Sequence, residues 1–157
     1  DLSMVLLLEY GDNSMLFTGD MERIGERSLA NGLGPVDLLK VPHHGSNTSS
    51  TEEFLDALTP KAGFISVGRN NGFGHPHAEV IDRYMDRGID IYRTDEMGAV
   101  TIYLDGENYQ ITPFIKGEKG ISYVLEAHGF EIIYSIIYII GVYISIKYYM
   151  GVEGIEL

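Results

Sequence analysis

Short apolar runs alternate along this chain with segments of helical spacing, and this alternation limits the possible folds more than any other feature. The runs predict strands at 3–10, 15–18, 36–41, 62–67, 89–92, 99–104 and 109–115. Apolar residues at helical spacing predict helices at 21–29, 52–58 and 76–87. Strands that alternate with helices in this order indicate a mixed α/β fold, with helices laid over a sheet.

Turn and cap residues set the expected ends of these elements. The turn residues at 11–14 and the pair Asp105-Gly106 each predict a hairpin. Ser50 and Glu53 have the spacing of a capping box before the second helix. Pro76 suits the first position of the third helix.

Composition excludes several classes of site. The chain has 11 Lys and Arg residues and 23 Asp and Glu residues, so its net charge is −12. A basic surface therefore cannot by itself hold nucleic acid. The chain contains no cysteine, which excludes disulfides, thiolate ligands and cysteine nucleophiles. Metal ligands would therefore have to be His, Asp or Glu.

The composition changes after Lys116. Residues 132–146 carry no charge, and eight of these 15 residues are Ile. We therefore predict two parts: a folded part at 1–116 and an apolar tail at 117–157. The tail has nearly the length of a membrane helix, but its β-branched content is equally typical of a buried strand pair or of low-complexity sequence.

Three polar clusters follow or adjoin predicted strands, where α/β folds place their functional residues. These clusters are Thr18-Gly19-Asp20, His43-His44-Gly45-Ser46 and Gly74-His75-Pro76-His77. A carboxylate combined with imidazoles suits zinc or manganese, and a carboxylate at a strand end can bridge two ions. The cluster composition favours a metal-dependent hydrolase.

Each cluster also has a structural interpretation. Asp20 could cap the helix that follows it, and the His43-His44 pair could lie in a solvated loop. His77 falls in the first turn of a predicted helix, where an exposed position is the common outcome. The spacing His75-x-His77-x-Glu79 resembles a metal-binding run, but the Asp-His pair that should close it is absent, so we reject that match.

The clusters and their flanking strands, taken in order, resemble the C-terminal metallo-β-lactamase-like domain of ComEC-type DNA-internalisation proteins. The resemblance is carried by Leu16-Phe-Thr-Gly-Asp20, Asp37-Leu-Leu-Lys-Val-Pro-His-His-Gly-Ser46, Ser66-Val-Gly-Arg-Asn, Gly74-His-Pro and Ile91-Tyr-Arg-Thr-Asp95. It extends over residues 1–115.

This resemblance implies an αββα sandwich, of which the chain supplies the C-terminal half. It also implies two divalent ions, zinc or manganese, with Asp20 as a bridging ligand and His44 as a later ligand. His43 would face the substrate or support the ligands, and which of the two neighbouring histidines binds metal stays open. His75 would contact a phosphate or donate a proton.

Members of the family carry a His-x-[His/Asp]-x-Asp-His run before the region matched here, and this sequence has none. We therefore expect the chain to be part of a longer protein, to need the upstream half of the domain as its partner, and to be inactive alone. The implied function is hydrolysis of single-stranded DNA during natural transformation, at the outer side of the cell membrane.

Two other functions remain open. The same fold hydrolyses lactones, thioesters and phosphorylcholine esters, and the negative charge of this chain suits such substrates. Alternatively, the chain could be a non-catalytic truncated module.

Overall fold

The computed structural model describes residues 3–115, which lie in a compact unit spanning Asp1–Lys116. The predicted tail at 117–157, with its proposed membrane segment, lies outside the described residues. Between residues 3 and 115, no helix is long and apolar enough to cross a membrane.

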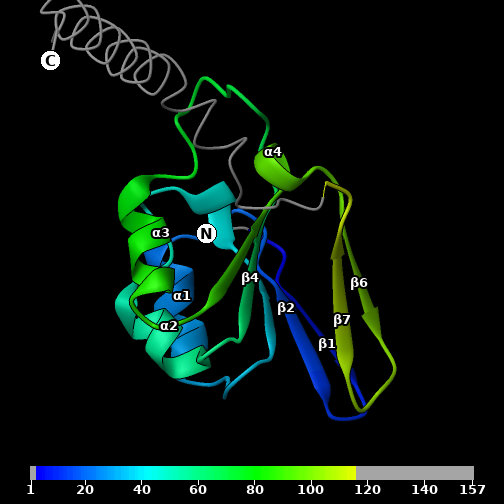
Figure 1. Cartoon of the computed structure of the whole chain (residues 1–157). Helices are drawn as coiled ribbons and strands as arrows, with labels where there is room; N and C mark the ends of the chain where they lie inside the picture. The colour runs from blue at the N-terminus through cyan, green and yellow to red at the C-terminus, as the bar shows by residue number, and fades with distance from the viewer. Residues whose placement is uncertain (1–2, 116–157) are drawn as a thin grey trace, which may run out of the picture. The chain divides into compact units, whose positions relative to one another are not determined.

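The central element is a five-stranded sheet with strand order β1-β2-β3-β4-β5 (Figure 1). These strands are β1 (Leu6–Tyr10), β2 (Asn13–Phe17), β3 (Leu38–Lys40), β4 (Ala62–Ile65) and β5 (Asp90–Arg93). β1 and β2 form an antiparallel hairpin, whereas β2, β3, β4 and β5 run parallel to one another. The carboxyl ends of these four parallel strands therefore lie along one edge of the sheet.

Helices cover one face of this sheet, and a separate hairpin covers the other (Figure 1). The helical layer contains α1 (Arg23–Ala30), α2 (Glu52–Leu58) and α3 (Ala78–Met85). The hairpin consists of β6 (Val100–Leu104) and β7 (Tyr109–Pro113), and the short helix α4 (Thr94–Met97) follows β5. A layer of helices, a sheet and a second sheet are three of the four layers of an αββα sandwich, so the mixed α/β prediction is confirmed.

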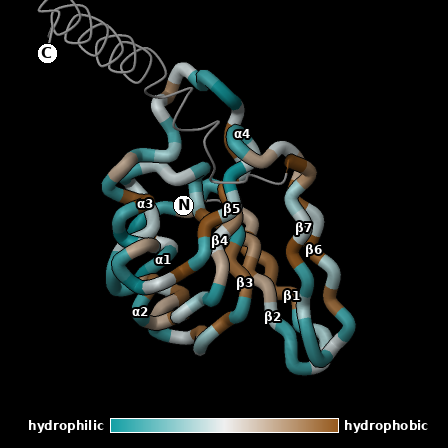
Figure 2. The backbone as a smooth tube through the Cα atoms, viewed as in Figure 1, coloured by the Kyte–Doolittle hydropathy of each residue, from teal (hydrophilic) through white to brown (hydrophobic). Residues whose placement is uncertain are grey.

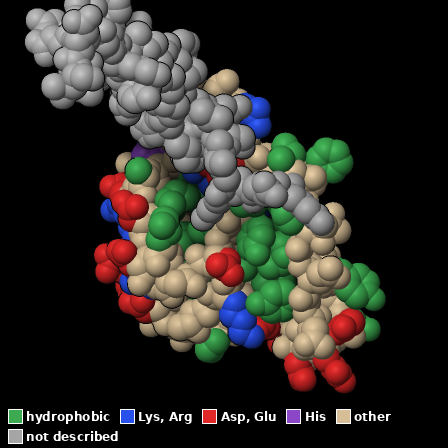
Figure 3. Space-filling view, viewed as in Figure 1, with side chains coloured by type: hydrophobic (Ala, Val, Ile, Leu, Met, Phe, Trp, Pro, Cys, Tyr) green, Lys and Arg blue, Asp and Glu red, His purple; other side chains and the backbone are tan. Residues whose placement is uncertain are grey.

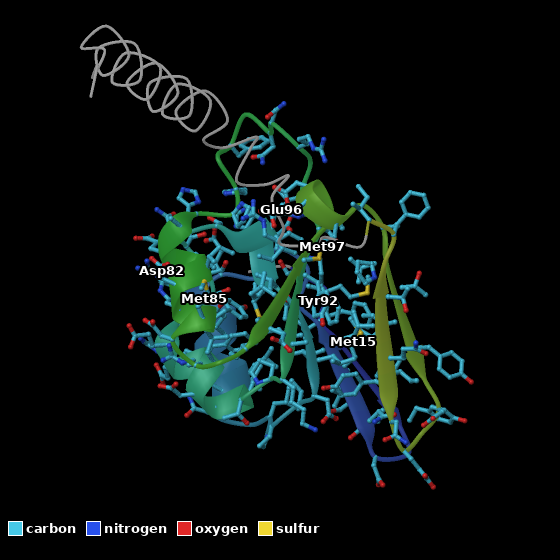
Figure 4. The ribbon with its side chains drawn as sticks, viewed as in Figure 1. Met15, Asp82, Met85, Tyr92, Glu96 and Met97 are labelled. Carbon is cyan, nitrogen blue, oxygen red and sulfur yellow. The ribbon has the colours of Figure 1, made fainter. Side chains whose placement is uncertain are left out.

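Side chains of the parallel strands point alternately into two cores, as the two-residue period of a strand requires. The helix-side core includes Leu16, Leu39, Ile65, Phe54, Leu55 and Tyr84. The core between the sheets includes Met15, Leu38, Ala62 and Phe64, packed against Tyr92 and the β6–β7 hairpin. Hydrophobic residues are concentrated on the central strands in Figure 2, and Figure 4 shows Met15 and Tyr92 between the sheets. Both faces of the central sheet are therefore covered.

Several predicted boundaries were wrong. The N-cap of α2 is Thr51, whose Oγ1 accepts the Phe54 N–H at 3.4 Å, and not Ser50. Ser50 instead has a φ of 56° and turns its N–H toward Glu26. The N-cap of α3 is His77, so Pro76 lies just before this helix and not at its first position. The sequence reading also missed α4.

Glu26 of α1 is fully buried, which is unusual for a carboxylate. Its Oε1 accepts the N–H of Ser50, and its Oε2 accepts the N–H of Thr51 at 2.9 Å. The hydroxyl of Ser50 lies 3.1 Å from the buried Tyr84 hydroxyl. Glu26 therefore ties α1 to the start of α2 and, through Ser50, to α3.

Asp37 joins the starts of β2, β3 and β4. Its Oδ2 accepts the N–H and the Oγ–H of Ser14, both at 2.9 Å, and its Oδ1 accepts Lys61 Nζ at 2.7 Å. Burial acts to raise the pKa of Asp37, but the hydrogen bonds from Lys61 and Ser14 outweigh it, and the pKa falls below the ordinary value of 3.8. The ionised carboxylate is therefore favoured by folding.

We expect Asp37→Asn to lower the free energy of unfolding by about 1–2 kcal/mol at neutral pH, because charge-assisted hydrogen bonds are lost. The Asp37 contribution is present above pH 3.8 and is lost as the pH falls through the lower pKa of the folded state. The difference between variant and wild type should therefore shrink below about pH 4. Urea unfolding at several pH values measures it, with the exposed Asp82→Asn as control. A difference that stays constant down to pH 2 would contradict this role.

Candidate functional site

The parallel strands bring the predicted clusters to one edge of the sheet. Asp20 follows β2, and the 3-10 turn Pro42–Gly45, which contains His43 and His44, follows β3. Two backbone hydrogen bonds join the loops: the His43 N–H donates to the Gly19 carbonyl at 3.1 Å, and the His77 N–H donates to the Gly45 carbonyl at 2.9 Å. Residues far apart in the sequence thus share one surface.

Asp20 and His44 face each other across 3.3 Å, from Oδ1 to Nε2. The Nδ1 atom of His44 lies 2.6 Å from the carbonyl oxygen of Ser66. A carbonyl oxygen can only accept, so Nδ1 carries the proton in this hydrogen bond. In the neutral ring, the Nε2 lone pair then points at a carboxylate, which is repulsive unless a cation or a proton lies between the two atoms.

His43 has different partners. Its Nδ1 lies 3.3 Å from Glu22 Oε1 and 3.4 Å from the Thr48 hydroxyl, and that hydroxyl also donates to Glu22 at 2.9 Å. This network holds the ring of His43 through its Nδ1 atom. The sequence reading did not single out Glu22, although its position two residues after Asp20 was the available signal.

The backbone of the His43-His44 pair is left-handed at two consecutive non-glycine residues. His43 has a φ of 45° and His44 a φ of 55°. Such conformations cost on the order of 1–3 kcal/mol each and are found preferentially at functional sites. The turn directs the two rings to different partners, His43 toward Glu22 and His44 toward Asp20.

His75 lies next to these residues. Its ring centroid is 5.8 Å from that of His43, and its Nδ1 is 3.2 Å from His77 Nδ1. Burial lowers the pKa of His75 below 6.5, and the charges of His77, His43 and His44 lower it further. These surroundings favour the neutral form of the His75 ring. His77 is half-buried beside it, a pairing that the sequence reading missed because it assigned His77 to an exposed helical turn.

Lys40, the last residue of β3, places a positive charge near Asp20. Its Nζ donates to the Val41 carbonyl at 2.9 Å. Burial lowers the pKa of Lys40, and the negative charge of Asp20 partly opposes this shift. The carboxylate is therefore close to one cationic side chain at the base of the site.

The structure thus gathers all four predicted site residues, as the pairs Asp20–His44 and His43–His75. Among residues 3–115, no group of three or more His, Cys, Asp or Glu side chains is arranged to hold a metal ion. Asp20 and His44 therefore form a pair of candidate ligands.

Comparisons with known proteins show what the chain as a whole is similar to. Residues 3–69 match the model of the metallo-beta-lactamase superfamily. It is 42% identical over 100 residues to ComE operon protein 3 of Bacillus subtilis, covering 62% of this chain and 13% of that protein. It is 44% identical over 81 residues to Recombination protein 2 of Haemophilus influenzae, covering 52% and 10%. The resemblance to the ComEC-type C-terminal domain is confirmed.

A third relative is Competence protein ComA of Neisseria gonorrhoeae, 40% identical over 101 residues, which are 62% of this chain and 15% of that protein. The chain therefore spans only a small part of the length of these relatives.

Proposed function

We propose that this chain contributes the Asp20–His44 half of a metal centre that hydrolyses DNA phosphodiester bonds during DNA uptake. One observation carries the proposal: His44 donates Nδ1–H to a backbone carbonyl and turns Nε2 toward Asp20. Histidine ligands of metals commonly donate their other ring N–H to a backbone carbonyl or carboxylate, which fixes the tautomer. The relatives named for competence supply the biological setting.

The pair fits a divalent ion. Bonds of about 2.1 Å at a tetrahedral angle separate two ligand atoms by about 3.4 Å. The 3.3 Å between Asp20 Oδ1 and His44 Nε2 is close to that value. Zinc or manganese suits this oxygen and nitrogen pair. When bound, such ions polarise a phosphodiester and lower the pKa of a coordinated water.

The remaining residues of this chain position the substrate. Glu22 and Thr48 orient His43, and the neutral His75 offers an imidazole for hydrogen bonding to a phosphate oxygen. Burial and the neighbouring histidines lower the pKa of His75, which favours a contact with the phosphate through the neutral ring.

A tight zinc site has three or four protein ligands, which is one or two more than this pair supplies. We propose that the other ligands come from the upstream half of the domain, with its His-x-[His/Asp]-x-Asp-His run, and that residues 1–157 alone have little activity. Single-stranded DNA is the proposed substrate, and the proposed location is the outer side of the cell membrane.

We expect the 157-residue chain to retain less than one equivalent of zinc or manganese after dialysis, since a two-ligand site binds weakly. Elemental analysis of the dialysed chain measures the metal content. A chimeric domain, in which the preceding segment of the Bacillus subtilis relative is joined to this chain, should retain two equivalents. Two tightly held equivalents on the 157-residue chain alone would contradict the ligand assignment.

The competing function is hydrolysis of a small ester or lactone. The net charge of −12 favours it, and Figure 3 shows acidic side chains spread over the visible surface. The same chimeric domain distinguishes the two functions when its metal-dependent rates on single-stranded DNA and on lactones are compared. A non-catalytic module would hydrolyse neither.

A further inference from the structure

A loop beside the histidines carries an exposed aromatic side chain that the proposed metal chemistry does not use. Phe73 is 82% exposed. Its ring is stacked on that of His75, with centroids 5.9 Å apart and planes 16° from parallel. The ring of His75 is in turn 5.8 Å from that of His43. A row of three rings therefore runs from solvent to the candidate site.

The side chain of Asn71 makes three hydrogen bonds within the loop that holds Phe73. Asn71 Nδ2 donates to the Gly68 carbonyl at 3.1 Å and to the His75 carbonyl at 2.6 Å. Asn71 Oδ1 accepts the His75 N–H at 3.0 Å. Phe73 is therefore presented to solvent by a hydrogen-bonded loop, and a ligand that contacts it would not have to order the loop first.

The space around Phe73 is open. A Cβ atom added at Gly68, Gly72 or Gly74 would meet nothing within 4 Å. Gly72 and Gly74, which flank Phe73, carry no side chain that could cover the exposed Phe73 ring. Phe73 is also stacked on His75, the residue proposed to contact the phosphate.

An exposed aromatic ring beside a phosphodiester site suits a ligand that carries aromatic bases. Nucleobases stack on aromatic side chains with little regard to sequence, because every base has a π face. This chain needs such a contact, since a net charge of −12 gives a strand no general electrostatic attraction. Lactones and small alkyl esters have no ring system that would use it.

We propose that Phe73 is a stacking platform for an unpaired nucleobase next to the bound phosphodiester, so that the site selects single-stranded nucleic acid over small esters. The inference rests on the proposed function, because it takes the residues around His75 as the phosphate-contacting part of the site.

The absence of tryptophan from the sequence allows a direct test. Phe73→Trp places a single fluorescent indole at the platform. Phe114→Trp is the matched control, because Phe114 is also 82% exposed but follows β7 in the other sheet. Each variant of the 157-residue chain is titrated in salt that screens its negative charge, with a chelator to prevent hydrolysis, against oligothymidylate and against an abasic strand of equal length.

We expect oligothymidylate to quench the fluorescence of Phe73→Trp in a saturable way, and the abasic strand to leave it unchanged. Phe114→Trp should respond to neither strand. Equal quenching by the abasic strand, equal quenching of the control, or no saturable quenching would each overturn the proposal. A free mononucleotide as a third ligand shows whether the platform recognises a base alone or a base within a strand.

Alanine and leucine variants measure the size of the contact. Phe73→Ala should weaken the binding of labelled oligothymidylate, measured by fluorescence anisotropy, by about 5- to 150-fold. Phe73→Leu should lose nearly as much, because it keeps apolar area but not the π face. Full affinity in either variant would overturn stacking as the basis of binding.

The two proposals fail in different ways. If the stacking inference is wrong, the chimeric domain still hydrolyses DNA with metal, and Phe73→Trp shows no base-dependent quenching. If the proposed function is wrong, metal-dependent hydrolysis of DNA is absent, whatever the fluorescence of Phe73→Trp shows.

Discussion

Replacement of Asp20 by alanine is expected to abolish metal-dependent DNA hydrolysis in the chimeric domain. The carboxylate lies 3.3 Å from His44 Nε2, so its removal leaves His44 as the single candidate ligand of the pair. Loss of groups that merely support ligands costs about 10–100-fold in metal affinity or activity, so loss of a proposed ligand should cost more than about 100-fold. The removal also leaves the positive charge of Lys40 without the neighbouring carboxylate of Asp20.

The measurement is the rate of single-stranded DNA cleavage, together with the retained metal. Asp82→Ala is the matched control, because Asp82 is an exposed aspartate of α3 and lies on the outer side of that helix in Figure 4. His44→Ala should lose nearly as much activity as Asp20→Ala. Undiminished cleavage by Asp20→Ala would remove the basis for a metal hydrolase at this edge of the sheet.

Replacement of Glu26 by alanine is expected to have the largest effect on stability. Glu26 is fully buried, and the variant leaves the N–H groups of Ser50 and Thr51 without their acceptor. A buried donor left unsatisfied costs about 1–3 kcal/mol, so two of them should lower the free energy of unfolding by about 2–6 kcal/mol. Glu26→Gln keeps one acceptor oxygen and should lose roughly half as much.

Urea unfolding followed by circular dichroism measures this effect. The control is Glu53→Ala, because Glu53 is exposed and its contact with Arg27 is a 3.9 Å surface pair. We expect that control to change the free energy of unfolding by less than about 0.5 kcal/mol. Equal stability of Glu26→Ala and wild type would show that the buried carboxylate does not hold the helices together.

The order of elements could be predicted from the sequence because its signals are local. Near neighbours in the chain determine the two-residue period of β2 to β4. They also determine the helical spacing of the residues in α2. The cap of α2 could not be predicted in this way. Ser50 has the right residue type and spacing, but a buried carboxylate 24 residues earlier binds its N–H and Thr51 takes the capping role.

Four members of the candidate site were predictable from the sequence, but their pairing was not. Strand ends identify Asp20, His43, His44 and His75, since parallel strands end at a common edge. Sequence spacing cannot show that His44 faces Asp20 while His43 faces Glu22, because this depends on the left-handed turn between them. The contact of His77 with His75 depends on the Asn71 loop in the same way.

Gly45 joins the two loops of the site at a point with no spare volume. A Cβ atom added there would lie 2.6 Å from Pro76 Cβ, and the Gly45 carbonyl accepts the His77 N–H. The His44 turn and the His75 loop are therefore packed closely against each other, so the shape of each depends on that of the other. An engineer who exchanges one loop for that of a relative, to alter substrate choice, would have to exchange both together.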